Sequence, residues 1–373
     1  MPRMILARSP LGMPWPTLDP FLFCVHHDDR YPRGNGRFGP EPSLLAGRQI
    51  GSDFSRRDGW SMYHGQEVPG FPAHPHRGFE TVTLVRRGRI DHSDSLGAAA
   101  RFGDGDAQWL TAGRGIVHAE MFPLLDDAAE NPLELFQIWL NLPARSKMCE
   151  PYFSMLWAEK MPRARWVDAA GAGSELVVVA GRLPGLEAPS SVSLSASSLS
   201  SAATGGKNPL QPLPPPPDSW ASDARSDLGI FTLALDPQAR FVLPAAAGAE
   251  THRVAYFFAG ERLRVAGEAV DERVALQVAG DAPLEIVNTG ATRAELLVLQ
   301  GRPIGEPVAQ YGPFVMNTEA EIRAAFADYQ RARFGGWPWP SEAPVHGADP
   351  ARFARGPGGA AERPAPEVAA ARR

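Results

Sequence analysis

The chain has 373 residues, of which 44% are hydrophobic, so it is long enough for two ordinary domains with proper cores. Its formal charge of -5 comes from 37 basic and 42 acidic residues that are interspersed, which argues against direct nucleic-acid binding. Two cysteines are too few for a disulfide framework, and the sequence shows neither a secretory signal nor an apolar run long enough to span a membrane. We therefore expect a cytoplasmic protein that does not cross a membrane.

The first half of the chain is predicted to form short antiparallel strands. They are separated by Gly, Pro or Asp and cover Glu80 to Val85, Asp106 to Thr111, Ile116 to Phe122 and Leu135 to Leu142. Brief strands at this spacing are typical of an antiparallel sandwich or barrel. We place this first β domain at residues 15–165.

A second β domain is predicted at residues 166–335, interrupted by an insertion. Its strands cover Leu176 to Val179, Leu228 to Leu235, Arg253 to Phe258, Val274 to Val278, Leu284 to Val287 and Ala294 to Gln300. The insertion, at about residues 187–227, has eight serines between Ser190 and Ser201 and four consecutive prolines at 214–217. This composition predicts a disordered loop.

One helix is predicted near the end of the second domain, followed by a tail. Thr318 and Glu321 have the spacing of a capping box, and apolar residues follow at helical spacing. Gly335 is expected to provide the left-handed stop of this helix. Residues 336–373 are rich in Ala, Pro, Gly and Arg, and we expect them to be a disordered tail.

Two short patterns carry the chemistry, His74-Pro75-His76 and His118-Ala119-Glu120. Residues i and i+2 of a strand point to the same face, so each pattern offers two side chains to one point. If the two segments are neighbours, three imidazoles and one carboxylate converge and leave coordination positions open, as in a catalytic metal site. A lone pattern of this kind is more often a surface feature or a hydrogen-bonded core pair, but the pairing of the two favours the metal site.

Other histidines are weaker candidates. His92 is interpreted either as a base or ligand partner at the pocket mouth or as a surface-loop residue, and it stays outside the catalytic set. His26 and His27 are interpreted as a solvated loop. The second domain offers only His252, with His346 in the tail, so we expect a single metal ion per chain. Trp109, Met121 and Phe79 are expected in the core rather than as a substrate platform.

Three segments of the sequence resemble signature stretches of the pirin family. They are HPHRGFETVTLV at 74–85, GDAQWLTAGRGIVHAEM at 105–121 and IGEPVAQYGPFVMNTEAEI at 304–322. Weaker similarity covers residues 15–186 and 228–335. The resemblance implies an all-β bicupin, two tandem antiparallel jelly-roll barrels with a C-terminal helix, whose first cupin domain holds the metal.

The resemblance also implies which residues bind the metal and what the protein does. The family's ligands fall on His74, His76, His118 and Glu120, and the usual metal is iron, expected here as Fe²⁺. Two functions follow. One is a quercetin 2,3-dioxygenase-like enzyme acting on a flavonol or similar enol with dioxygen. In such an enzyme we expect, from the chemistry of the carboxylate and not from the resemblance, that Glu120 acts as the base once it loosens from the metal. The other is a non-enzymatic, redox-sensitive iron protein that binds a transcription or metabolic regulator.

Overall fold

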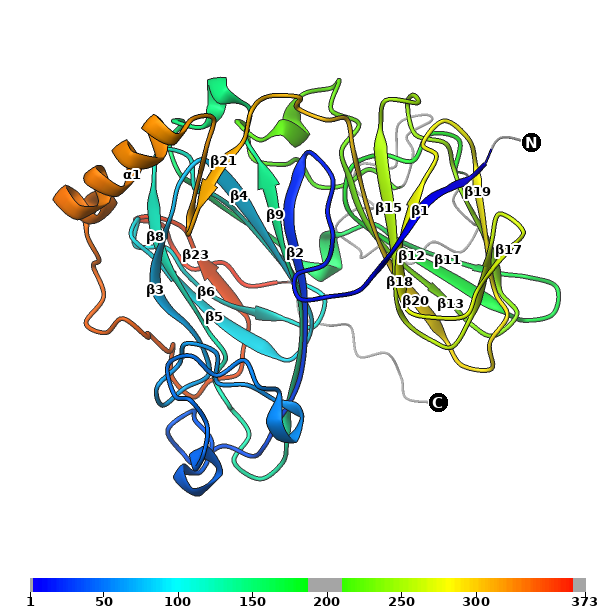
Figure 1. Ribbon diagram of the computed structural model, residues 1–373. Helices are drawn as coiled ribbons and strands as arrows, with labels where there is room; N and C mark the ends of the chain where they lie inside the picture. Colours follow the sequence, from blue (N-terminus) through cyan, green and yellow to red (C-terminus); the bar gives the residue numbers. More distant parts are fainter. Residues whose placement is uncertain (1–2, 187–209, 365–373) are drawn as a thin grey trace. The chain divides into compact units, whose positions relative to one another are not determined.

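The computed structural model describes residues 3–186 and 210–364 of the chain. These residues form β-sheets, several short 3₁₀ helices and one α-helix, and they divide into two compact units (Figure 1). One unit consists of Met1–Val25, Ile138–Pro143 and Lys160–Glu306, and the other of His26–Gln137, Ala144–Glu159 and Pro307–Arg373. The second of these, called the histidine unit below, contains both histidine patterns.

The unit built around Lys160–Glu306 consists of two sheets. The larger sheet has seven strands in the order β1 (Ile5–Pro10), β18 (Val274–Val278), β15 (His252–Ala259), β20 (Ala294–Gly301), β13 (Gly229–Leu235), β12 (Gly173–Ala180) and β11 (Arg163–Val167). The smaller sheet has four, in the order β14 (Arg240–Leu243), β19 (Leu284–Asn288), β16 (Leu263–Val265) and β17 (Glu268–Val270). Apolar side chains of both sheets, such as Phe231 and Ile286, form one buried cluster, so the sheets pack face to face.

The histidine unit repeats this two-sheet plan. One sheet has the order β23 (Phe353–Arg355), β6 (Ala99–Gly103), β5 (Arg89–Asp94), β8 (Ile116–Met121) and β3 (Gly70–His76). The other has the order β10 (Tyr152–Leu156), β7 (Ala107–Thr111), β4 (Phe79–Arg87), β9 (Asn131–Asn141) and β2 (Phe21–Tyr31). The division between the two units falls within β2 and within β9. Phe102 of β6 and Val85 of β4 belong to one buried cluster, so the histidine patterns lie in a two-sheet sandwich.

The predicted strands are confirmed, and so is the helix. Helix α1 (Glu319–Ala332) begins at the predicted capping box, in which the Thr318 hydroxyl accepts from the Glu321 backbone N–H and the Glu321 carboxylate accepts from the Thr318 backbone N–H. Its left-handed stop lies on Arg333 rather than on Gly335, because the Arg333 backbone N–H already closes on the Tyr329 carbonyl. The helix packs on the hairpin of β21 (Ala309–Tyr311) and β22 (Phe314–Met316).

The C-terminal residues correct the prediction of a disordered tail. The segment up to residue 364 is described, and β23 within it pairs with β6 (Figure 1). The segment Pro307–Arg373, including α1, belongs to the histidine unit, whereas the sequence placed residues up to 335 in the second domain. The contacts that order this segment come from strands far away in the sequence, so its own composition does not reveal them.

The predicted insertion is corrected in part. Residues 187–209 lie outside the described part of the chain, but residues 210–227 are described and include the 3₁₀ helix Trp220–Ser222. Trp220 is buried there, and its indole N–H donates to the Arg302 carbonyl at 2.9 Å. Burying one large aromatic side chain stabilises a segment that its proline content alone would leave unordered.

Candidate metal centre

The pairing of β3 with β8 brings the two histidine patterns together. His74 lies directly opposite His118 in the antiparallel register, and His76 lies opposite Ile116. A β-bulge between Phe71 and His74 shifts this register by one residue. The bulge contains Pro72, which has no backbone N–H to lose at an irregular position.

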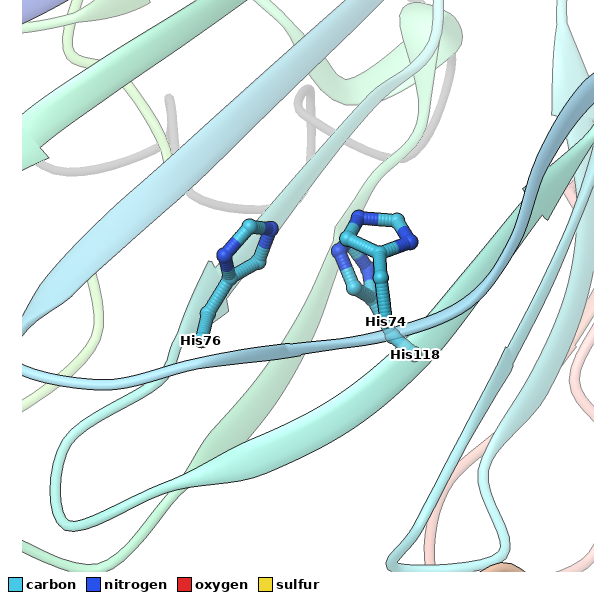
Figure 2. A group of neighbouring side chains, drawn as sticks. All are labelled: His74, His76 and His118. Carbon is cyan, nitrogen blue, oxygen red and sulfur yellow. The ribbon is translucent and has the colours of Figure 1, made fainter. Parts of the chain in front are cut away.

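The three imidazoles of His74, His76 and His118 converge (Figure 2). One ligand atom from each lies within 4.8 Å of the others, and the ring centroids of His74 and His118 are 4.4 Å apart. All three rings project to the same side of their strands. Among the described residues this is the single group of three or more side chains placed to hold a metal ion, and it contains three of the four predicted ligands.

Hydrogen bonds to backbone carbonyls orient two of the three rings. The His74 Nδ1–H donates to the Pro72 carbonyl at 2.8 Å, and the His76 Nδ1–H donates to the Pro313 carbonyl at 3.4 Å. A histidine held through Nδ1 in this way presents the lone pair of Nε2. The bulge and the β21–β22 turn therefore orient two of the rings.

His118 is the most informative of the three. It is fully buried, and neither of its ring nitrogens has a hydrogen-bond partner within the described ranges. A buried imidazole without any partner is costly, because its polar atoms have lost their water without compensation. A metal ion bound between the three rings would remove that cost, so these residues fit such an ion.

Burial keeps the three imidazoles neutral. Loss of solvation lowers the pKa of His74 to about 4 and lowers the pKa values of His76 and His118 well below their usual range. The neighbouring histidines act in the same direction. Neutral imidazole is the form that binds a metal, so the site is prepared for one at neutral pH.

Glu120 lies on the same strand as His118, but its carboxylate is not in the group of three imidazoles. One carboxylate oxygen accepts from the Thr83 hydroxyl at 2.9 Å, and the other accepts from the Gln137 side-chain amide at 3.1 Å. Burial raises the pKa of Glu120, although these two hydrogen bonds act against the shift. Glu120 is thus a buried carboxylate held beside the histidines.

The sequence interpretation missed Thr83 and Gln137. Thr83 lies in β4 and Gln137 in β9, and both strands contain several other polar residues, so the sequence alone did not distinguish these two. The hydroxyl of Thr83 also lies 2.6 Å from the Gln137 side-chain oxygen, so the two residues and Glu120 form one buried polar cluster. A threonine inside a strand is too common to be selected without its neighbours.

His92 is not a surface-loop residue. It is fully buried in β5, directly opposite Glu120, with its ring centroid 5.6 Å from that of His118. Its Nε2–H donates to Asp94 at 3.2 Å, and the Gln108 amide donates to its Nδ1 at 3.2 Å. His92 is therefore held beside the three histidines, and both of its ring nitrogens are hydrogen-bonded.

The interpretation of His26 and His27 as a solvated loop is wrong. Both lie in β2, and His27 is buried with its Nδ1 2.8 Å from the Tyr63 hydroxyl. The predicted core positions of Phe79, Trp109 and Met121 are confirmed, since all three are buried. The Phe79 ring centroid is 4.9 Å from that of His76, so Phe79 forms an apolar side of the metal centre.

Comparison with known proteins identifies the family. The pirin model matches residues 41–140, and the model of the pirin C-terminal cupin domain matches residues 230–335. Pirin-1 of Arabidopsis thaliana is 35% identical over 269 residues, which cover 71% of this chain and 78% of that protein. This chain belongs to the pirin family. It is a bicupin, as the sequence resemblance implied.

Two further proteins that this chain resembles are named as quercetin dioxygenases. A candidate quercetin 2,3-dioxygenase of Pseudomonas aeruginosa is 35% identical over 270 residues, covering 72% of this chain and 80% of that protein. The solved structure of quercetin 2,3-dioxygenase from Acinetobacter baumannii has a TM-score of 0.56 at 24% identity, and the match covers 86% of this chain and 99% of that one. The structural likeness supports the fold. None of the helices in the described part of this pirin is long and apolar enough to cross a membrane.

Proposed function

We propose that this pirin is an iron-dependent dioxygenase that acts on quercetin or a similar flavonol or enol. The observation that carries the proposal is the buried imidazole of His118, which has no hydrogen-bond partner in the described part of the chain and lies with its ligand atoms within 4.8 Å of those of His74 and His76. The name of the Pseudomonas aeruginosa relative supports the choice of reaction. Iron and oxygen substrates suit a site with histidine ligands and open positions.

His74, His76 and His118 would hold one iron ion, and Glu120 would complete the set. Each carboxylate oxygen of Glu120 accepts one hydrogen bond and keeps a second lone pair for the ion. When bound, iron would supply redox chemistry between an electron-rich substrate and dioxygen. The apolar ring of Phe79 beside His76 would help to exclude water from this part of the site.

Glu120 would also act as the base for the substrate. A flavonol presents an acidic enol hydroxyl, and a carboxylate with a raised pKa is a better proton acceptor than an ordinary one. Thr83 and Gln137 hold the carboxylate in place while it takes the proton, because each binds a different oxygen. The expected role of Glu120 is thus to bind the ion and, once it has loosened from the ion, to deprotonate the substrate.

Oxygen uptake tests this function. The iron-loaded protein is expected to consume oxygen with quercetin at a rate well above that of free iron, and Glu120→Gln is expected to lose turnover by about a hundredfold or more. The melting temperature of the metal-free variant should stay close to that of the wild type, since glutamine keeps the shape of the side chain. No uptake by the wild type with a panel of flavonols and other enols would contradict the enzyme and favour the redox-sensitive binding protein.

A further inference from the structure

The C-terminal strap, defined as residues 337–364, runs beyond the part of the chain that the family models match. It is not loosely attached. Its strand β23 pairs with β6, the Arg352 guanidinium lies 2.8 Å from the Asp106 carboxylate, and Arg352 also pairs with Glu159. These contacts fix the far end of the strap on the histidine unit.

The strap is hydrogen-bonded to two residues of β5, the strand that pairs with β8. The Trp339 indole N–H donates to the Asp94 carbonyl at 2.8 Å, and the His346 Nε2–H donates to the His92 carbonyl at 2.8 Å. In the sheet, Asp94 lies opposite His118 and His92 lies opposite Glu120. The two strap side chains therefore hold the strand next to these predicted ligands.

The strap is also bonded to β3, on the other side of β8. The Ala73 backbone N–H donates to the Glu342 carbonyl at 2.7 Å. Ala73 lies in the bulge, where the ladder to β8 is interrupted. The strap thus satisfies a backbone group next to His74, in the same bulge whose Pro72 carbonyl orients the His74 ring.

We propose that the C-terminal strap positions the metal ligands, with Trp339 and His346 as its positioning residues. β5 and β3 flank β8 in the sheet, and the strap is hydrogen-bonded to both. It fixes the spacing at which His74 meets His118. The inference rests on the metal site proposed above. It adds that the ligands reach their binding geometry only when the strap is hydrogen-bonded to β5 and β3.

Cobalt binding to the full chain tests the role of the strap. Trp339→Phe keeps an aromatic ring but removes the indole donor, and His346→Leu removes the imidazole donor. Each is expected to weaken Co²⁺ affinity about five- to tenfold, measured by competition with a chelator, and to alter the visible absorption of bound Co²⁺. His346→Gln, which restores a donor near the same place, should recover part of the loss.

Trp337 supplies a matched control. It lies in the same strap, but its indole N–H donates to the Ser341 carbonyl within the strap. Trp337→Phe is therefore expected to change Co²⁺ affinity by less than about twofold. Hydrogen exchange should increase in β3 and β5 in the Trp339 and His346 variants, and remain unchanged in the sheet of β13 and β20.

Three outcomes separate the two proposals. If His76→Ala with His118→Ala binds Co²⁺ as tightly as the wild type, the metal site itself is wrong. If the wild type binds at the histidines but Trp339→Phe and His346→Leu match its affinity and spectrum, the strap does not position the ligands. If these variants lower the melting temperatures of the metal-free and metal-loaded protein equally, the strap only stabilises the fold, which also overturns the inference.

Discussion

At the scale of single residues, Thr83 and Thr81 have different environments although both lie on β4 and both are buried. The Thr83 hydroxyl reaches Glu120, whereas the Thr81 hydroxyl has no partner among the described residues. Thr83→Val should lower the free energy of unfolding of the metal-free protein by about 1–3 kcal/mol, because it removes a donor from a buried carboxylate. Thr81→Val should cost nothing.

Urea denaturation of both variants measures the difference. Because the two substitutions change the same atoms on the same strand, intrinsic strand propensity cancels between them. Equal losses of stability in the two variants would show that the hydrogen bond between Thr83 and Glu120 contributes nothing.

A second residue-scale prediction concerns pH and the buried residues His27, Tyr63 and Asp29. The Tyr63 hydroxyl donates to Asp29 at 2.7 Å and lies 2.8 Å from His27. Burial lowers the pKa of His27 to about 3 and raises the pKa of Asp29 to about 6. These two shifts have opposite effects on stability in acid.

The sign follows from which state binds more protons. Below its usual pKa of 6.5, His27 takes up a proton more readily in the unfolded chain, so its contribution to stability is lost as pH falls from 6.5 toward 3. Asp29 takes up a proton more readily in the folded state, so its contribution grows as pH falls from about 6 toward 3.8. Relative to the wild type, Asp29→Asn should therefore lose stability more steeply between about pH 6 and 4, and His27→Gln less steeply. Parallel curves for all three metal-free proteins would refute the assignment.

The sequence could predict that three of the candidate ligands lie together, because period-two spacing depends only on local geometry. His74, His76 and His118 needed no knowledge of the fold beyond two neighbouring strands. Predicting that His92 is buried requires the order of the strands as well, because its burial depends on β5 lying between β6 and β8. Thr83 and Gln137 are recognisable only once Glu120 is seen between them.

At the scale of elements, helix α1 is tied to the segment that carries His74 and His76 through Arg77, the residue after His76. The Arg77 guanidinium pairs with Asp328 of α1 at 2.9 Å, lies over the Phe334 ring at 4.4 Å, and donates to the Arg114 carbonyl at 2.6 Å. Arg77 is buried, whereas the side chain of Asp328 is 32% exposed, so the pair is shielded from solvent on the side of the arginine only.

Removing this link should loosen the helix. Arg77→Leu is expected to lower the free energy of unfolding by about 1–2 kcal/mol and to speed hydrogen exchange in α1. Arg331→Leu is the control, because Arg331 pairs with the same Asp328 but is exposed, and its loss should cost less than about 0.5 kcal/mol. A larger loss with Arg331→Leu than with Arg77→Leu would contradict this role of the buried arginine.

The helix and the strap show how far local sequence predicts an element. Thr318 and Glu321 lie three residues apart, which is the spacing of a capping box, so this local pattern alone locates the start of α1. The strap has no such pattern, and its order depends on Asp94, His92 and Ala73, which lie more than two hundred residues earlier. Composition describes a segment in isolation and therefore predicted disorder for it.

At the scale of the whole molecule, two sandwiches of one plan have unequal chemistry. In the described residues of the unit built around Lys160–Glu306, the single histidine is His252, whose Nδ1–H donates to the Asp19 carbonyl at 2.9 Å. A lone histidine engaged in this way cannot assemble a site of the same kind. The duplicated fold is thus expected to hold one metal ion per chain, in the histidine unit.

Elemental analysis of protein purified without an affinity tag or chelator tests this central claim most directly. We expect about one iron per chain in the wild type, and almost none in the variant that combines His76→Ala and His118→Ala, because that variant keeps only one of the three imidazoles. The variant must be shown to fold by its circular dichroism. A wild-type value near two, or full metal retention by the folded double variant, would place the ligands elsewhere and contradict the account.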